Sequence, residues 1–218
     1  MISLTNMINC VRENRRLVPF FKAVFIYFAL SCEADGPPSA WAAAFKCAPV
    51  MCLMACVAGC GYGWYARFVA LGLGLSAIGD ALLVWPQYFL PGMGAFAVAH
   101  IAYILAFGWK PQSYLTLYVI YEGVSLYIQA ICPPASLSVL VQGYALLLTT
   151  MTWHGIVRKG IQRYGVLLFL ISDAILGYSL FRGTVPYKQV IVMSTYYSGQ
   201  FFIAMSALQR PQSAVVTN

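Results

Sequence analysis

Long apolar runs follow one another along almost the whole chain, separated by short polar stretches. Each run is long enough, or nearly so, for a helix that crosses a membrane, which takes about 17–25 residues. The first run is the shortest, so its ends are the hardest to define. The eight runs lie at Leu17–Ser31, Ser39–Cys60, Ala66–Trp85, Pro91–Gly108, Pro111–Ala130, Ser136–Gly155, Tyr164–Phe181 and Lys188–Leu208.

The continuity of these runs favours helices over membrane-embedded strands. Strands of a membrane barrel alternate apolar and polar residues, whereas a spanning helix is apolar throughout and satisfies its own backbone groups. The short connections predict antiparallel neighbours in one bundle. We therefore expect an all-α polytopic membrane protein with eight transmembrane helices. Residues 17–208 would form this domain, between a cytosolic N-terminal segment (residues 1–16) and a cytosolic tail (residues 209–218).

The composition agrees with a membrane protein and argues against a soluble domain. Apolar residues make up 61% of the chain and charged residues only 9%, whereas soluble domains carry roughly 25% charged residues. Three of the seven cysteines, Cys52, Cys56 and Cys60, share one helical face but lack a Cys-x-x-Cys motif or a partnering histidine motif. We expect them to be packing residues, and we expect no metal or cofactor.

The basic residues between the runs predict the orientation of the chain. With a cytosolic N-terminus, most of them fall on the cytosolic side, as the positive-inside rule requires, and both termini are cytosolic. This distribution explains the net charge of +7 without a nucleic-acid partner. The cytosolic set is Arg12, Arg15, Arg16, Arg67, Lys110, Arg158, Lys159, Arg163 and Arg210. The opposite side receives fewer charges, at Glu33, Asp35, Arg182 and Lys188.

A short motif recurs in the third and seventh runs. Residues 78–83 (IGDALL) resemble residues 171–176 (ISDAIL), and each copy contains an aspartate, Asp80 or Asp173. Because the copies are four helices apart, both helices should run in the same direction, which fits two parallel four-helix halves. Membrane proteins often place a ligand site at the interface between such repeats.

Charged side chains within the spans need a reason to be there. An Asp or Lys at the centre of a membrane helix costs about 2.5–3.5 kcal/mol on insertion scales. One interpretation is a catalytic carboxylate pair, in which one Asp keeps its proton as an acid while the other is ionised. The other is a structural set of ion pairs that locks the bundle, and the residues alone favour neither. The charges in question are Lys22, Lys46, Asp80, Glu122 and Asp173.

Further polar residues are predicted at a similar depth, between the midplane and the outer half of the bundle. His100 and Tyr103 are three residues apart, and Tyr196 and Gln200 are four apart, so each pair shares a helix face. His100 alone is also explained by a hydrogen bond across a helix interface, and Lys22 and Lys46 by snorkelling to the headgroups. The candidate supporting residues are Lys22, Lys46, His100, Tyr103, Tyr196, Tyr197 and Gln200.

Six short motifs, taken in order, resemble those of the lysoplasmalogenase (YhhN-like) family of eight-span membrane proteins, and the chain looks most like the vertebrate members. The resemblance covers about residues 17–208. It implies Asp80 and Asp173 as the paired aspartates, an endoplasmic reticulum location and no metal; Glu122 is not part of the pattern. The motifs are residues 18–23 (VPFFKA), 45–49 (FKCAP), 78–80 (IGD), 99–103 (AHIAY), 171–173 (ISD) and 193–200 (MSTYYSGQ).

The resemblance also implies an activity, hydrolysis of the vinyl ether bond of lysoplasmenylcholine and lysoplasmenylethanolamine. The products would be a fatty aldehyde and glycerophosphocholine or glycerophosphoethanolamine. An Asp pair suits this reaction, because it can protonate the alkene carbon, stabilise the oxocarbenium ion and activate water, as carboxylate pairs do in glycosidases. The expected partners are the lysoplasmalogen, water and the lipid bilayer, with a homodimer as a further option and no nucleic acid.

Two other functions compete with the enzyme. Repeated halves with intramembrane carboxylates also suit a proton-coupled transporter of small molecules or lipids, although the spans lack paired Gly or Pro breaks at matching positions. A lipid-binding or scaffold protein would use the same charges only for structure. Uptake without cleavage would identify the first, and lipid binding that survives substitution of the aspartates would identify the second.

Overall fold

Helices form nearly all of the chain in the computed structural model, which describes residues 4–31, 38–109, 113–158 and 160–208. Within these ranges the fold is all-α, as predicted, with eight α-helices and one short 3-10 helix, η1. The bounds are α1 Leu4–Ser31, α2 Ala40–Cys60, α3 Gly63–Leu82, η1 Pro86–Tyr88, α4 Phe89–Phe107, α5 Tyr114–Ile131, α6 Ala135–Val157, α7 Gln162–Phe181 and α8 Lys188–Leu208.

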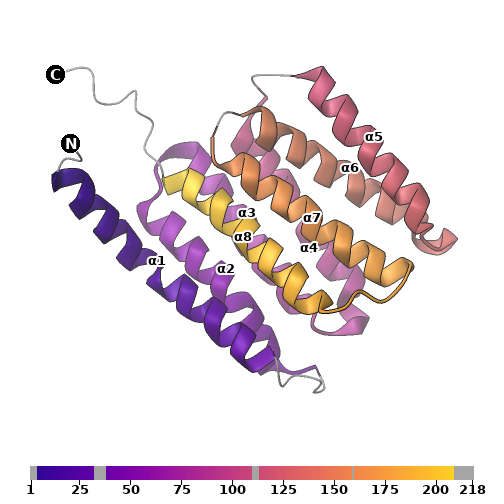
Figure 1. Cartoon of the computed structure of the whole chain (residues 1–218), viewed down its shortest axis with the longest axis horizontal. Coiled ribbons are helices and arrows are strands. Elements are labelled where there is room, and N and C mark those ends of the chain that lie inside the picture. Colours follow the sequence, from indigo (N-terminus) through magenta and orange to yellow (C-terminus); the bar gives the residue numbers. More distant parts are fainter. Residues whose placement is uncertain (1–3, 32–37, 110–112, 159, 209–218) are drawn as a thin grey trace.

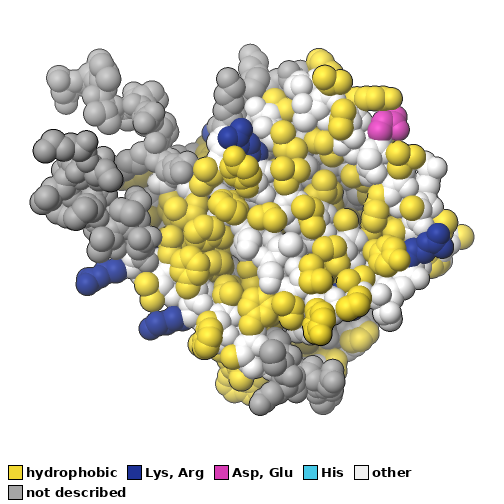
Figure 2. All heavy atoms as spheres, in the orientation of Figure 1, with side chains coloured by type: hydrophobic (Ala, Val, Ile, Leu, Met, Phe, Trp, Pro, Cys, Tyr) yellow, Lys and Arg dark blue, Asp and Glu magenta, His cyan; other side chains and the backbone are white. Residues whose placement is uncertain are grey.

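Several of these helices have the length and apolar composition needed to cross a membrane. Among the described residues five stretches qualify, namely α2, α3, the segment Pro86–Phe107, α6 and α7. Large apolar side chains are exposed on the molecule, among them Phe25 at 75% and Val139 at 80%, and hydrophobic side chains cover much of the face in Figure 2. The protein is therefore a polytopic membrane protein. α1, α5 and α8, which were also predicted to span, are not among the five.

The predicted helix boundaries differ most at α1, which begins at Leu4 rather than Leu17. Residues 4–16 contain neither Gly nor Pro, so the helix continues beyond the apolar run that hydropathy detects. The N-terminal segment predicted at residues 1–16 is thus mostly helical. α2 begins as predicted, because the Ser39 side chain accepts a hydrogen bond from the Ala42 backbone N–H at 3.1 Å, a common N-cap.

The charges used to predict the orientation are only partly within the described structure. Arg15, Arg16, Arg67, Arg158 and Arg163 belong to it. The backbone of Arg12 is helical, but its side chain lies outside the description. The remaining charges outside it are Glu33, Asp35, Lys110, Lys159 and Arg210.

The neighbours of each helix follow a pattern that repeats after four helices (Figure 1). α1 packs on α2, α2 on α3 and α3 on α4; in the same way α5 packs on α6, α6 on α7 and α7 on α8. The contact between α2 and α8 likewise corresponds to that between α6 and α4. α1 and α5 lie at opposite edges, so the helices between them form the core.

α3 and α7, which carry the recurring motif, both run antiparallel to α8 and are therefore parallel to each other. Residues nearer the C-terminus of α3 or α7 contact residues nearer the N-terminus of α8. The pairs are Tyr65–Ser206 and Asp80–Tyr196 for α3, and Gly165–Ile203 and Ser172–Val192 for α7.

Two glycines extend the repeat and allow close packing at the core. Gly72 and Gly165 each lie eight residues before the aspartate of their helix. A Cβ atom on Gly72 would lie 2.4 Å from the ring of Tyr103, and one on Gly165 would lie 2.6 Å from the backbone oxygen of Gly199. Both positions therefore exclude larger residues and bring α3 and α7 close to their neighbours, as small residues do in membrane bundles.

Side chains of α6 bind the end of α4 and the segment after it. Arg158 donates a hydrogen bond to the backbone oxygen of Phe107 at 3.1 Å, and His154 Nδ1 is 2.6 Å from the backbone oxygen of Gly108. Trp153 donates from its indole nitrogen to the backbone oxygen of Ser113 at 2.9 Å. The Phe107 and Gly108 carbonyls at the end of α4 would otherwise lack partners, so His154 and Arg158 fasten α4 to the second group of four helices. The Ser113 carbonyl is at the N-cap of α5 and also accepts a hydrogen bond from the Leu117 backbone N–H at 3.2 Å.

Candidate active site

Asp80 is buried near the C-terminal end of α3 and has partners from two other helices. Lys46 of α2 places its Nζ atom 3.6 Å from Asp80 Oδ1, and Tyr196 of α8 donates a hydrogen bond to Asp80 Oδ2 at 2.6 Å. The adjacent Tyr197 donates to the backbone oxygen of Lys46 at 2.7 Å. The ion pair and these hydrogen bonds offset the cost of burying both charges.

Asp173 occupies the matching place in α7, with different neighbours. Tyr144 of α6 donates a hydrogen bond to Asp173 Oδ2 at 2.6 Å. In the part of the chain that the structure describes, the Lys46–Asp80 contact is the one ion pair, so no Lys, Arg or His pairs with Asp173. The two carboxyl groups are close enough to interact electrostatically, although only one has a cation beside it.

Aromatic rings pack around the two carboxyl groups. Phe96 lies 6.0 Å from Tyr196 and 6.2 Å from Phe169, and Phe169 lies 5.4 Å from Tyr196, all as centroid distances between tilted or edge-on rings. Phe169 is four residues before Asp173 on α7, and Tyr196 binds Asp80. The rings exclude water and lower the local dielectric, which strengthens electrostatic interactions at this site.

A second set of polar side chains lies about one helical turn from the carboxyl groups, and we call it the second polar layer: Ser76, His100, Tyr103 and Gln200. Tyr103 donates a hydrogen bond to Gln200 Oε1 at 2.7 Å. Gln200 Nε2 and both ring nitrogens of His100 have no hydrogen-bond partner among the described residues. The His100 ring is 5.1 Å from the ring of Tyr144, the partner of Asp173.

The structure brings most of the predicted site residues together. Lys46, Asp80, Tyr196 and Tyr197 are directly linked, and Tyr103, Gln200 and His100 form most of the neighbouring layer. Lys22 is exposed on α1 and forms no ion pair with either aspartate among the described residues, so it is not placed with the others. Glu122, which the family pattern omits, is exposed on α5.

Sequence reasoning missed Tyr144 and Ser76. Tyr144 is the single tyrosine of α6, but fifteen tyrosines occur in the chain and nothing in the local sequence marks this one. Ser76 lies four residues before Asp80, and that helical spacing is the one signal that would have identified it.

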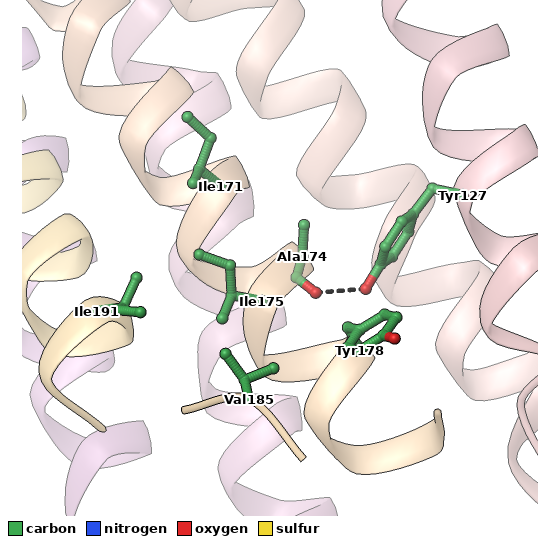
Figure 3. A pocket seen from close by; sticks show the side chains of 7 residues that line it. All are labelled: Tyr127, Ile171, Ala174, Ile175, Tyr178, Val185 and Ile191. Atoms are coloured by element: carbon green, nitrogen blue, oxygen red, sulfur yellow. Dashed lines mark hydrogen bonds between the residues drawn. The ribbon is translucent and has the colours of Figure 1, made fainter. Parts of the chain in front are cut away.

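An apolar groove lies on the side of α7 that faces away from Asp173 (Figure 3). Its volume is about 310 Å³, and residues from α5, α7, α8 and the α7–α8 connection line it. The α7 residues that line the groove recur at helical spacing along one face of the helix, and Asp173 lies on a different face. The Tyr127 hydroxyl donates to the backbone oxygen of Ala174 within the groove. The lining residues are Tyr127, Ile171, Ala174, Ile175, Tyr178, Val185 and Ile191.

The described residues include no group of three or more His, Cys, Asp or Glu side chains placed to hold a metal ion. The site offers carboxyl, phenol, ammonium, imidazole and amide groups. Two carboxyl groups with different neighbours can divide the roles of proton donor and anion.

Comparison with known proteins places the chain among relatives of matching length. The YhhN family profile matches residues 41–207. The lysoplasmalogenase TMEM86B of Homo sapiens is 38% identical over 208 residues, which is 90% of this chain and 88% of the relative. The lysoplasmalogenase TMEM86A of Bos taurus is 34% identical over 220 residues, 90% of each chain. No solved structure matches significantly. The resemblance of the motifs is thus confirmed, and the chain belongs to the YhhN family, together with the TMEM86 lysoplasmalogenases.

Proposed function

We propose that this protein is a lysoplasmalogenase, which hydrolyses the vinyl ether bond of lysoplasmenylcholine and lysoplasmenylethanolamine. The observation that carries the proposal is the pair of carboxyl groups, Asp80 and Asp173, in matching places of two parallel helices of one membrane bundle. The activity named for the vertebrate relatives supports it. The products are a fatty aldehyde and glycerophosphocholine or glycerophosphoethanolamine.

The reaction proceeds through an oxocarbenium ion. A carboxylic acid transfers its proton to the β-carbon of the vinyl ether, and the electron pair of the double bond forms the new C–H bond. The cation that results is shared between the α-carbon and the ether oxygen, and a carboxylate beside it lowers its energy. Water then adds to the α-carbon and returns a proton, and the hemiacetal collapses to the aldehyde and the glycerol alcohol.

The neighbours of the two aspartates support a division of these roles. The ammonium group of Lys46 favours the ionised form of Asp80, which suits it to stabilise the cation and activate water. Asp173 has a phenol as its partner and no cation among the described residues. Asp173 is therefore the better proton donor. General acid–base groups of this kind contribute about 10²–10⁴-fold to a rate.

The membrane supplies the substrate, and we propose that all eight helices cross it as two parallel halves with both termini in the cytosol. The repeated pattern of helix neighbours and the parallel α3 and α7 support the two halves. The basic residues support the orientation. The family resemblance supports an endoplasmic reticulum location.

The proposal is tested by purifying the protein in detergent and measuring aldehyde release from both lysoplasmalogens. The wild type should release aldehyde, whereas Asp80→Asn and Asp173→Asn should not. Glu122→Gln, which removes an exposed carboxylate, is the matched control and should keep full activity. A folded Asn variant with wild-type activity would exclude the two-carboxylate mechanism. Uptake of a substrate into proteoliposomes without cleavage would instead favour the transporter.

A further inference from the structure

The second polar layer contains hydrogen-bonding groups that the described protein leaves unsatisfied. His100 and Gln200 are fully buried, and both His100 ring nitrogens and Gln200 Nε2 lack partners among the described residues. Buried polar groups are almost always paired, and leaving them unpaired in a lipid-embedded core is unfavourable. Two such side chains on facing helices, α4 and α8, indicate a site for a ligand.

The contacts of the layer place Gln200 beside Tyr103 and next to Asp80, and they place His100 beside Tyr144, the partner of Asp173. Gln200 accepts a hydrogen bond from Tyr103 and also lies beside Tyr196, the tyrosine bound to Asp80. Tyr103 lies beside Ser76, and His100 is three residues before Tyr103 on α4. Ser76 lies one helical turn before Asp80 on α3, and Gln200 lies one turn after Tyr196, the partner of Asp80, on α8.

The chemistry of the layer selects a neutral ligand. It contains an amide donor, an imidazole that donates from one nitrogen and accepts at the other when neutral, and hydroxyl groups, but no charged side chain. A phosphate or an ammonium headgroup would lack a counter-charge there. A hydroxyl group both donates and accepts, so it satisfies an imidazole acceptor and an amide donor together.

We propose that the second polar layer binds a hydroxyl group next to the carboxylate pair, with His100 and Gln200 as its direct contacts. The inference rests on the proposed function and deepens it. The reaction offers two hydroxyl sources: the water that attacks the oxocarbenium ion, and the free glycerol hydroxyl of the lysolipid. In the second case the layer sets specificity for lysolipids, because an esterified oxygen cannot donate and carries a bulky acyl chain.

The experiment compares lysoplasmenylcholine with an analogue that lacks only the free glycerol hydroxyl. The kcat and KM for aldehyde release are measured for the wild type, His100→Phe and Gln200→Leu, with folding checked by thermal unfolding in detergent. Thr152→Val is the matched control: it also removes a buried hydroxyl without a partner among the described residues, but it lies eight residues, about 12 Å, from Tyr144 along α6. His100→Gln, which keeps a donor and an acceptor, should retain more activity than His100→Phe.

The two sources give different results. If the lipid hydroxyl is bound, the wild type should use the analogue at least about 100-fold less efficiently, and both variants should lose that discrimination. If water is bound, the wild type should use both substrates alike, and the variants should lower kcat for both at unchanged KM.

The inference is overturned if folded His100→Phe and Gln200→Leu keep the kcat and KM of the wild type on both substrates. It is equally overturned if His100→Gln and Thr152→Val lose as much activity as His100→Phe, because the effect would then reflect packing. A wild type that releases no aldehyde from lysoplasmenylcholine would instead remove the proposed function, and this outcome is separate from the comparison of variants.

Discussion

Asp80 and Asp173 occur in copies of one motif on parallel helices, yet their surroundings differ. In each half the second helix supplies a partner: α2 supplies the ammonium of Lys46 to Asp80, and α6 supplies the phenol of Tyr144 to Asp173. Among the described residues, one carboxyl group therefore has a cation beside it, and the other has a neutral hydrogen-bond donor and no cation. The difference shows how two copies of the same side chain acquire separate roles through the helices that face them.

Removing either carboxyl group should have the largest effect. Asp80→Asn and Asp173→Asn should each lower kcat by about 10³-fold or more, because the first variant lacks the anion and the second lacks the proton donor. Aldehyde release measured on folded, detergent-purified variants checks this. If one variant alone retains a tenth of the activity, a single carboxyl group performs the chemistry. The proposal that Asp80 and Asp173 have separate roles would then be wrong.

Removing the ammonium group of Lys46 should have the next largest effect on activity. Lys46→Met should lower kcat by about 10–100-fold, because Asp80 would lose the charge that favours its ionised form. Lys22→Met is the control, since Lys22 is exposed and outside the site, and its activity should stay within about twofold of wild type. Equal losses in the two variants would show that Lys46 acts through the membrane surface rather than through Asp80.

Replacing Tyr196 or Tyr144 tests whether Asp80 is ionised and Asp173 protonated, because each tyrosine donates a hydrogen bond to one of these aspartates. Hydrogen bonds to charged groups contribute about 1.5–3 kcal/mol and neutral ones about 0.5–1.5 kcal/mol. Tyr196→Phe should therefore reduce the free energy of unfolding more than Tyr144→Phe, because its partner is the ionised aspartate. Unfolding in detergent with added denaturant measures both values. If Tyr144→Phe is the more destabilising variant, the assignment of acid and anion must be reversed.

Exposed charges on α5 should matter least. Glu122→Gln should change neither aldehyde release nor the unfolding midpoint measurably, because the side chain is solvent- or lipid-facing and has no ion pair among the described residues. A clear loss of activity would show that α5 contributes to the site, and the two-aspartate comparison would then be incomplete.

The helices follow from the sequence because apolar runs are strong signals, and the rarity of intramembrane charges identified Lys46 and Asp80 as candidate site residues. That these two residues pair with each other was only one of two alternatives that the sequence left open. Tyr144 does not follow from it. Its role depends on the rotation of α6 about its own axis, which is set by packing against α4 and α7. The start of α1 was wrong for a different reason: hydropathy reports contact with lipid, whereas helix formation continues into polar residues that favour it.

The fastening of α4 by His154 and Arg158 has a consequence for the geometry of the site. These contacts join the two groups of four helices at the end of the bundle that is opposite to the aspartates, because α3 and α7 run antiparallel to their neighbours. The hydrogen bonds of Tyr196 to Asp80 and of Tyr197 to the backbone oxygen of Lys46 join the same two groups beside the aspartates. The two groups are therefore joined at both ends of the bundle, which holds Asp80 and Asp173 in a fixed arrangement.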